Sequence, residues 1–518
     1  MKKTMIRLLS LILALSSLLL PSGCARQPGS QPEPSGPSQA DEPPVQQPEQ
    51  QTPDSEQSNP TLGLAYYQNL GLDPYNCVAL ANRAILPLVY EGLFRVSSSF
   101  TAEPVLCSSY TVSSDGLSYT FSLQPNVSFH NGKKLTAADV VYSLTECQSS
   151  SYYGNRLYNV ASITALSQTQ VELVLLNPMD NLPVLLDIPI IPLGAKSSGL
   201  PAGTGPYLLP TSTGVLKANP RWWQERAGLT QQEQWQLVNV ASSSEIRDQF
   251  EYAEVNLVCA DPSSDAAATY HSDYELWSCP TTIMQYVGFN LQREPFSNEA
   301  LRSIITYAVD RSTIVSSLCG GFADAASLPV NPASDYYDAK LAAKYDYSPE
   351  TFRTQLSSSG PYAMEATFLV CSSSSQRVAA AQQIADAVNS FGFHLTVEAL
   401  PYEQYKQALL QGDYDLYYGE ARLSASFDLT QFFTSDGSMC FGGMADSSVE
   451  ALCQFALENG GNSYDLYKRI LERGLLCPVL FKTYAVYTTR GAFSNLTPAM
   501  DHVLWQAPQS QEALIKKD

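Results

Sequence analysis

The chain has 518 residues, of which 44% are hydrophobic and 15% are charged, and its formal net charge is −20 at pH 7. This length exceeds what one hydrophobic core usually organises, so two or more domains are expected. The negative charge argues against a nucleic-acid partner, because no run of Lys or Arg beyond the N-terminus offsets the repulsion of a polyanion.

The first 23 residues have the pattern of a bacterial export signal. MKKTMIR is basic, and the apolar LLSLILALSSLLL that follows is short for a membrane span. Ser22 and Gly23 precede Cys24 as in a lipobox, although Pro21 stands where leucine is usual. We predict a signal peptide over 1–23 and lipidation of Cys24, which would anchor the protein to the extracytoplasmic face of the cell membrane. The alternative is an ordinary secretory signal with Cys24 left free.

Residues 24–60 are rich in proline and contain almost no large apolar side chain. Such a segment cannot compensate the conformational entropy that folding removes. We predict a disordered tether, roughly 30–35 Å from end to end as a flexible coil, that holds a folded body away from a bilayer. A passive linker is an equally compatible interpretation.

The body of the chain has the pattern of a mixed α/β protein. TLGLA, residues 61–65, indicates a first strand, and apolar alternation in LSYTFSL, residues 117–123, predicts a half-buried one. Thr136 and Asp139 have the spacing of a capping box that opens a helix. His130 precedes the turn between these elements, and we interpret it as scaffold rather than as part of an active site.

Two later segments also have structural interpretations. GTGPY, residues 203–207, lacks the Lys-Ser/Thr of a phosphate loop and is typical of a tight turn. Residues 298–315 carry apolar side chains at helical spacing, which predicts a helix facing the core; Arg302, Asp310 and Arg311 fall mostly off its apolar stripe. The stripe consists of Leu301, Ile304, Ile305, Ala308 and Val309.

The sequence offers little catalytic or metal-binding chemistry. Ten cysteines follow Cys24 without a CxxC pair or a Cys/His zinc spacing, so buried thiols are favoured for most of them, although disulfides stay possible. There is no GxSxG or HExxH motif, and the four histidines stand in no catalytic context. The 50 acidic residues leave a carboxylate pair for glycoside cleavage open, but no pair stands out. We predict a protein without enzyme activity, cofactor or resident metal.

The segment SDGLSYTFSLQPNVSFHNGKKLTAADVVYSL, residues 114–144, closely resembles a conserved block of the family 5 extracellular solute-binding proteins. These are the peptide, dipeptide and nickel receptors of ATP-binding cassette importers. Further blocks resemble the family in the same order, and together they cover about residues 61–505. They are LPLVYEGLF (86–94), PAGTGPYLL (201–209), VGFNLQREPFSNEALRSIITYAVDRSTIV (287–315) and DLYYGEARLSASFDLTQFF (415–433).

The resemblance implies a two-lobed α/β fold of the periplasmic-binding-protein type (type II, cluster C). The first lobe would comprise 61–285 and 483–518, with an extra subdomain at about 96–195. The second lobe would comprise 286–482. Two crossing segments would form the hinge, and a ligand between the lobes would favour the closed state.

The resemblance also implies a function. The chain would be an extracellular lipoprotein that captures a small ligand, with a short peptide preferred, and delivers it to an ABC permease whose partner ATPase hydrolyses ATP. We expect a monomer. The alternatives are a ligand-sensing or adhesive surface lipoprotein that is not coupled to transport, and a receptor for a nickel chelate or another solute.

The segments that resemble the family supply candidates for ligand contacts. Aromatic side chains can bury the surface of a ligand, and charged side chains can bind its charged termini. Peptide-binding members of the family hold an amino terminus with an aspartate in a W-x-x-D type run, and the corresponding segment here, YYGEARLSASFD, has no tryptophan and no aspartate at that position. Two alternatives therefore stay open: Glu420 accepts the ammonium group of the ligand, or Arg422 binds a carboxylate of the ligand. Nickel is less favoured because the four histidines are far apart in sequence. The candidates are Tyr66, Tyr67, Gln68, Tyr90, Glu91, Tyr286, Asn290, Glu420, Arg422 and Phe427.

Overall fold

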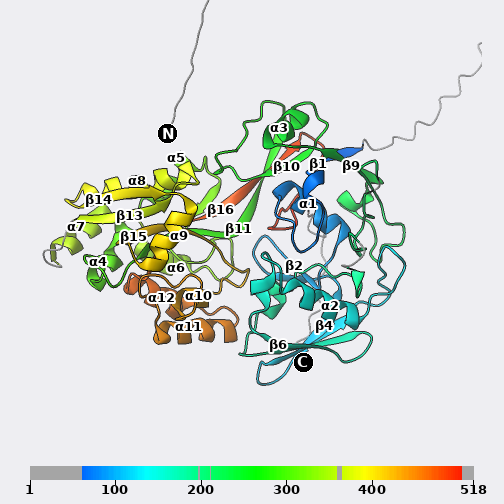
Figure 1. Ribbon diagram of the computed structural model, residues 1–518, viewed down its shortest axis with the longest axis horizontal. Helices are drawn as coiled ribbons and strands as arrows, with labels where there is room; N and C mark the ends of the chain where they lie inside the picture. The colour runs from blue at the N-terminus through cyan, green and yellow to red at the C-terminus, as the bar shows by residue number, and fades with distance from the viewer. Residues whose placement is uncertain (1–60, 196–198, 211, 359–364, 505–518) are drawn as a thin grey trace, which may run out of the picture. The chain divides into compact units, whose positions relative to one another are not determined.

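The computed structural model describes residues 61–195, 199–210, 212–358 and 365–504 (Figure 1). The predicted signal peptide, the lipidation site Cys24 and the tether lie outside these residues and stay predictions. Within the described ranges, no helix combines the length and the apolar character needed to cross a membrane.

A ten-stranded mixed sheet forms the framework. Its strands lie in the order β14-β13-β15-β11-β16-β10-β1-β9-β8, and β12 pairs with β16. The parallel and antiparallel pairs are mixed, as expected for an α/β fold. The strands are β1 Leu62–Tyr66, β8 Val215–Lys217, β9 Gln234–Asn239, β10 Leu257–Ala260, β11 Tyr274–Phe289, β12 Ala323–Ala325, β13 Glu365–Cys371, β14 His394–Leu400, β15 Leu416–Arg422 and β16 Leu476–Thr489.

Two long antiparallel strands, β11 and β16, join the two halves of the sheet (Figure 1). At one end β16 pairs with β10, next to β1 and β9 of the first lobe. At the other end β11 pairs with β15, next to β13 and β14 of the second lobe. Their register shifts between Pro280 and Met284. The predicted lobe boundaries at 285/286 and 482/483 fall inside these strands, and the division itself stays a prediction.

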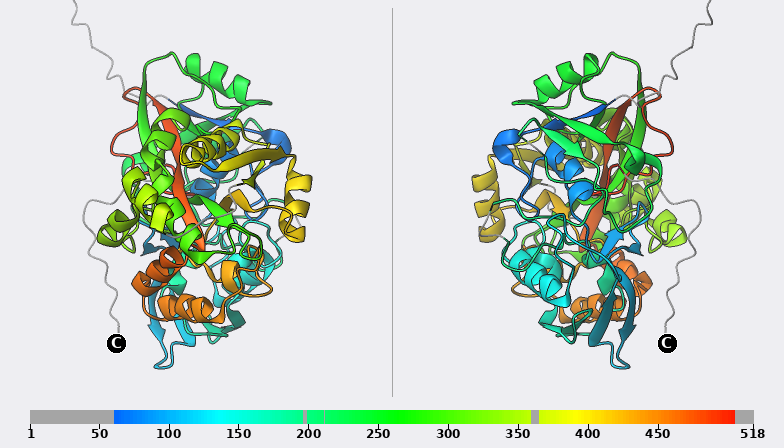
Figure 2. Two further views of the ribbon diagram at one scale, coloured as in Figure 1. Left: turned by 90° about the vertical axis from the view of Figure 1, so that its left-hand side faces the viewer. Right: turned by 90° about the vertical axis from the view of Figure 1, so that its right-hand side faces the viewer.

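Helices accompany the strands of both lobes. In both views of Figure 2, α3 lies at the end of the molecule opposite the extra subdomain. The first lobe carries α1 Leu80–Val89 and α3 Ser243–Glu251. The second lobe carries α4 Glu299–Ile304, α5 Arg311–Leu318, α6 Ala339–Ala342, α7 Pro349–Ser358, α8 Ser375–Asn389, α9 Tyr402–Gln411, α10 Thr430–Phe433, α11 Ser447–Glu458 and α12 Tyr464–Glu472.

The predicted apolar stripe of residues 298–315 is buried throughout, which confirms its place in the core. The segment is not one helix, however, because α4 ends at Ile304 and a 3-10 turn, Ile305–Ala308, precedes α5. Arg302 and Arg311 are buried as well. Their guanidinium groups donate to backbone carbonyls, for example to Gly474 just before β16 and to Pro478 within it, which satisfies donors that burial would otherwise leave without water.

The extra subdomain contains a four-stranded antiparallel sheet with the order β4-β5-β7-β6. The predicted strand is β5, with Tyr119, Phe121 and Leu123 buried, and the predicted capping box is present, since the Thr136 N–H donates to Asp139 Oδ2 at 2.8 Å. Both predictions are confirmed. The elements are β2 Phe94–Val96, β3 Ala102–Pro104, β4 Cys107–Val112, β5 Ser118–Leu123, α2 Ala137–Cys147, β6 Val160–Ala165 and β7 Gln170–Leu175.

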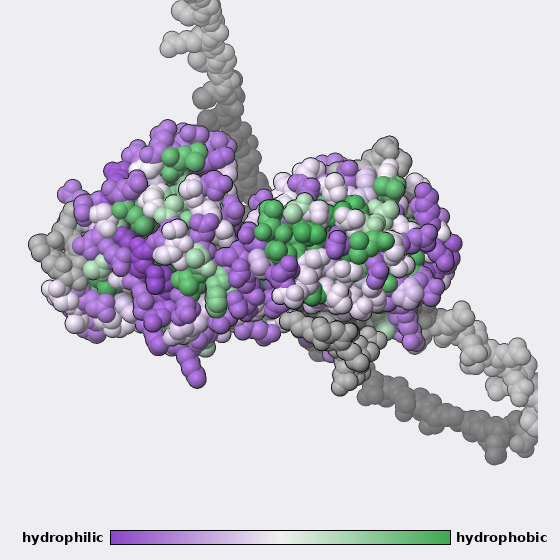
Figure 3. All heavy atoms as spheres, turned by 90° about the horizontal axis from the view of Figure 1, so that it is seen from below, coloured by the Kyte–Doolittle hydropathy of each residue, from purple (hydrophilic) through white to green (hydrophobic). Residues whose placement is uncertain are grey.

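The surface and the thiols are those of an ordinary folded domain. Seen from below, apolar groups form separate patches among hydrophilic side chains (Figure 3), as on an ordinary domain surface. The ten cysteines of the described chain are free thiols, and all except the half-buried Cys440 are buried. The interpretation of these cysteines as buried thiols agrees with this arrangement.

The GTGPY turn is a tight structural contact with the end of α1. A Cβ atom on Gly203 would lie 1.8 Å from the Val89 carbonyl oxygen, so only glycine fits there. His130 Nε2 lies 3.1 Å from the Gly205 carbonyl oxygen, which supports the scaffold interpretation of this histidine.

Glu91 follows α1, and its carboxylate accepts hydrogen bonds from the indoles of Trp222 and Trp223 at 3.1 and 3.0 Å.

A buried ion-pair network ties the segment after β16 to the first lobe. Arg83 Nη2 lies 2.6 Å from Asp501 Oδ1, and Arg156 contacts both Asp501 and Asp187. The Tyr152 hydroxyl lies 2.9 Å from both Asp501 oxygens. Burial alone would raise the pKa of Asp501, but Arg83 and Arg156 hold it well below its usual range. Asp501 is therefore ionised while the protein is folded near neutral pH.

We expect Asp501→Asn to lower the free energy of unfolding at pH 7 by about 3–5 kcal/mol, because it leaves Arg83 buried without its counter-ion. Because the folded pKa is depressed, this stabilisation is present at neutral pH and is lost only as the pH falls through the folded value. Urea denaturation measures the difference. Arg247→Ala is the control, since Arg247 pairs with Asp248 at the exposed surface. Equal midpoints for D501N and wild type would contradict the prediction.

A second stability prediction concerns Glu91. Burial raises its pKa from 4.5 to about 7, although both indole N–H groups act in the opposite direction. Between these values the folded protein holds a proton that the unfolded chain releases, so the free energy of unfolding falls as the pH rises. In the Glu91→Gln variant this position does not titrate. Relative to that variant, we expect the free energy of unfolding of the wild type to fall by up to about 3 kcal/mol as the pH rises from the unfolded to the folded pKa of Glu91. Denaturation at several pH values tests this, and parallel curves for the two proteins would refute it.

Candidate functional site

A cluster of charged side chains lies where the two crossing strands meet both lobes. Lys482 stands in β16, and its ammonium group contacts Asp261, which follows β10 of the first lobe. The same ammonium lies 3.7 Å from Glu420 Oε2 in β15 of the second lobe. Glu420 also accepts a hydrogen bond from Gln285 Nε2 at 2.9 Å. Burial disfavours the Lys482 charge, but the two carboxylates outweigh it and raise its pKa.

Arg422 lies two residues beyond Glu420 in the same strand, so both side chains point to the same face. Its Nη2 donates to the Tyr484 hydroxyl at 3.1 Å and its Nη1 to the Tyr152 hydroxyl at 3.4 Å. The guanidinium carbon also lies 5.4 Å from the centre of the Tyr152 ring. Within the described chain, no carboxylate lies at ion-pair distance from Arg422.

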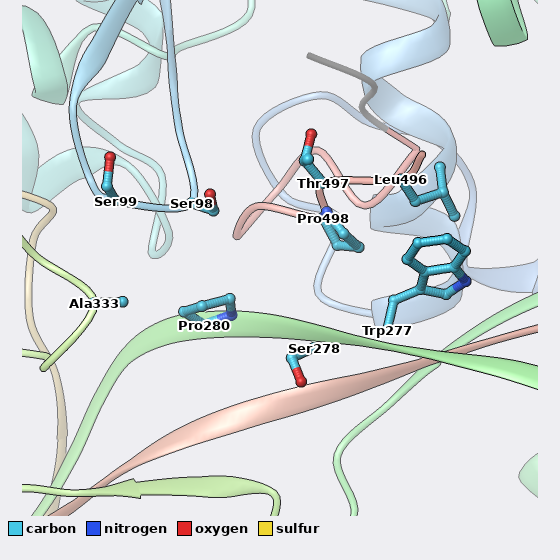
Figure 4. A pocket seen from close by; sticks show the side chains of 9 residues that line it. All are labelled: Ser98, Ser99, Trp277, Ser278, Pro280, Ala333, Leu496, Thr497 and Pro498. Carbon is cyan, nitrogen blue, oxygen red and sulfur yellow. The ribbon is translucent and has the colours of Figure 1, made fainter. Parts of the chain in front are cut away.

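A hollow of about 370 Å³ adjoins the crossing strand β11 (Figure 4). This volume is within the range of small-molecule sites. Residues of β11 form its floor, and Figure 4 shows Ala333 and the segment around Pro498 at different sides of it. The lining offers apolar and hydroxyl groups rather than charges. It consists of Ser98, Ser99, Trp277, Ser278, Pro280, Ala333, Leu496, Thr497 and Pro498.

Other contacts join the two lobes away from the crossing strands. Asp265, in the loop after β10, accepts from the backbone N–H of Ser375 at 3.2 Å and from its hydroxyl, at the start of α8. Those hydrogen bonds lower the pKa of Asp265. On the subdomain side, the Tyr158 hydroxyl donates to Asp428 Oδ2 at 2.7 Å, and the Asp180 N–H donates to the Leu457 carbonyl at 2.8 Å. The lobes therefore touch each other at several separate places in this structure.

The structure brings three predicted residues to the junction of the lobes, namely Glu420, Arg422 and Phe427. Phe427 has a positive φ of 52°, and its ring packs edge-on against Phe100, at 5.0 Å between ring centres, and against Phe481, at 5.9 Å. Phe100 precedes β3 and Phe481 belongs to β16. Phe427 thus links a loop of the first lobe, the crossing strand and the late segment.

Three other predicted residues lie at the end of β1. Tyr66 and Tyr67 are half-buried, and Gln68 is exposed at the start of a 3-10 turn, Gln68–Leu70. The Tyr67 N–H donates to Asn82 Oδ1 of α1 at 2.8 Å. No described contact joins these residues to Arg422, and a ligand contact by any of them stays a prediction.

The remaining predicted residues have their polar groups bonded inside the fold. The Tyr90 hydroxyl donates to the Pro201 carbonyl at 3.0 Å, and Glu91 accepts from two indoles. Tyr286 packs edge-on against Tyr417, where Gly419 leaves room for its ring. Asn290 Nδ2 donates to the carbonyls of Gly412 and Tyr414. Their roles in ligand binding stay predictions, and the candidate site centres on Glu420, Arg422 and Phe427.

Sequence reasoning missed Lys482, Tyr484, Tyr152 and Asp261. Lys482 had a usable signal, because it is the one charged residue in the apolar segment 475–486. Tyr152 and Asp261 had none, since they reach the site only through tertiary contacts.

In the described chain, no group of three or more His, Cys, Asp or Glu side chains is arranged to hold a metal ion.

Known proteins resemble this chain in sequence or in fold. The glutathione-binding protein GsiB of Escherichia coli O1:K1 is 29% identical over 306 residues, which is 56% of this chain and 59% of GsiB. The chain thus spans about three fifths of this curated relative. HbpA2 from Haemophilus parasuis superposes with a TM-score of 0.70 at 18% identity, over 83% of this chain and 95% of HbpA2. NikZ from Campylobacter jejuni, in complex with Ni(L-His), superposes with a TM-score of 0.62 at 20% identity, over 85% of this chain and 96% of NikZ.

The likeness to solved structures confirms the predicted two-lobed periplasmic-binding-protein fold. The sequence model described as "Bacterial extracellular solute-binding proteins, family 5 Middle" matches residues 101–438. This range includes blocks on which the resemblance was based, from the strand before His130 to the late segment. The chain therefore belongs to the family 5 bacterial extracellular solute-binding proteins.

Proposed function

We propose that this chain is the solute-binding component of an ATP-binding cassette importer. It captures a small ligand, with a short peptide as the preferred class, between its two lobes and passes it unchanged to a permease. A partner ATPase supplies the energy. Family membership supports the general activity. The observation that carries the proposal is the cluster of Lys482, Glu420, Asp261 and Arg422 at the crossing strands, because a ligand there would contact both lobes at once.

The location of the protein belongs to the same proposal. Removal of residues 1–23 and lipidation of Cys24 would attach the chain to the outer face of the cell membrane, and residues 24–60 would let the two-lobed body reach a permease. The sequence pattern supports this part. The protein would act as a monomer, because each chain contributes both lobes of its own site.

Ligand capture would work by a shift between open and closed arrangements. A ligand that contacts groups of both lobes binds the closed state more tightly and therefore raises its population. The irregular pairing near Pro280 gives the crossing strands a place to bend. The contact between Asp265 and the start of α8 would add to the stability of the closed state, since an anion is favoured at a helix N-terminus.

Native mass spectrometry with glutathione and a panel of two- to five-residue peptides tests the proposal. We choose glutathione because GsiB, by its name, binds it. We expect a complex with one ligand per chain for at least one compound, a smaller radius of gyration in solution scattering, and recovery of the ligand unaltered. Absence of binding across the panel, or turnover of a bound compound, would contradict the proposal.

Closure can be tested separately with Asp265→Ala. The substitution removes the acceptor at the start of α8 without touching the charged cluster, so we expect a several-fold weaker affinity for the ligand found above and a larger radius of gyration without ligand. Asp273→Ala is the matched control, because Asp273 is an exposed carboxylate shortly before β11 that pairs with Arg490. Identical affinities for D265A and D273A would show that this contact does not contribute to closure.

A further inference from the structure

We propose that the ligand is held through a carboxylate that binds Arg422, with Tyr484 and Tyr152 as the residues that position the guanidinium. This inference rests on the proposed function and names the chemical class of the ligand group. It also chooses between the two anchors that the sequence leaves open, an ammonium at Glu420 or a carboxylate at Arg422.

The first argument is the number of donors that remain at Arg422. A guanidinium group has five N–H donors. Arg422 donates one of them to the Tyr484 hydroxyl and one to the Tyr152 hydroxyl. The Nε–H and two further N–H groups have no described partner. The Tyr484 hydroxyl accepts from Arg422, and no described contact uses its proton. Three donors of one forked group therefore remain for an acceptor, and a carboxylate can accept two such donors in parallel.

The second argument is charge. The neighbouring Arg83 and Arg156 form ion pairs with Asp501 and Asp187. Among the described residues Arg422 makes no direct ion pair, since its contacts are two neutral phenols, and Asp501 favours its charge only from beyond the Tyr152 hydroxyl that lies between them. Arg422 is exposed and has no carboxylate of the described chain at ion-pair distance, whereas both carboxylates of the neighbouring cluster, Asp261 and Glu420, are engaged by Lys482. An anionic ligand group would pair directly with the Arg422 guanidinium.

The third argument is that Glu420 is already engaged. Its carboxylate accepts from Gln285 and faces the Lys482 ammonium at 3.7 Å. A ligand ammonium at Glu420 would have to displace Lys482 from a partly buried position, which would leave that charge less well compensated. A carboxylate at Arg422 displaces no charged partner. The geometry therefore favours an anionic anchor over a cationic one.

The position of Arg422 also couples the anion to closure. Arg422 comes from β15 of the second lobe, Tyr484 from the crossing strand β16, and Tyr152 from the segment after α2. The guanidinium reaches both tyrosines only while these parts lie close together. A carboxylate bound there would therefore be held best in the closed arrangement.

Paired probes test the inference: each peptide of the panel against its C-terminal amide, and glutathione against its diethyl ester, with affinities from calorimetry. We expect wild type to bind the free acid at least about 10-fold more tightly than the blocked form. Arg422→Ala should weaken binding of the free acid by on the order of 10- to 100-fold and abolish the preference. Arg422→Lys keeps the positive charge but lacks the forked guanidinium donors, so it should retain part of the preference for the free acid. Tyr484→Phe should cause a smaller loss that is confined to the free acid.

Arg353→Ala is the matched control, because Arg353 is an exposed arginine that pairs with Glu350 within α7. The ratio of acid to amide affinity separates an anchoring role from a folding defect, and thermal unfolding of each variant checks the fold. If R422A keeps both the affinity and the preference for the free acid, the inference is overturned while the proposed function stands. If wild type binds blocked and free forms equally, the carboxylate anchor is also excluded. If no probe binds, the proposed function itself fails.

Discussion

The pairing of β11 with β16 is the constraint on which the rest of the structure depends. These strands carry the chain twice between the lobes, so backbone hydrogen bonds rather than a flexible linker hold the two halves of the sheet together. A change in the angle between the lobes has to be absorbed within this pair, and its register shifts between Pro280 and Met284. Side chains from both lobes meet at the same stretch, which is why the candidate site lies there.

Charge compensation distinguishes the cations that are paired within the fold from Arg422, which we propose as the ligand anchor. A buried charge is costly unless a partner and hydrogen bonds replace water. Arg83 has Asp501, and Lys482 has Asp261 and Glu420. Arg422 contacts neutral phenols and keeps solvent exposure. A cation that is already paired gains little from a ligand, whereas one that is held in place without a counter-ion gains a charge-assisted hydrogen bond.

Local patterns in the sequence were enough to predict local structure. The alternation in β5, the capping box at Thr136 and Asp139, and the burial of the stripe at 301–309 are confirmed, because each depends on neighbours within a few residues. The helical spacing did not reveal the break after Ile304. The candidate site was predicted only in part: the late segment indicated Glu420 and Arg422, but strand pairing supplies Lys482 and Tyr484, and tertiary packing brings Tyr152 from far along the chain.

The choice between Glu420 and Arg422 shows why the ligand cannot be derived from the fold. Both residues stand in one strand, and the sequence gives them equal access to a ligand. Lys482, more than 50 residues further along the chain, engages one of them and leaves the other without a counter-ion. Solved proteins of the same fold are described with unlike ligands, such as the nickel complex of NikZ, so the framework itself does not fix specificity. In the binding mode proposed above, specificity would follow from which charge at the crossing strands has no counter-ion within the protein, and in this chain that charge would be the one on Arg422.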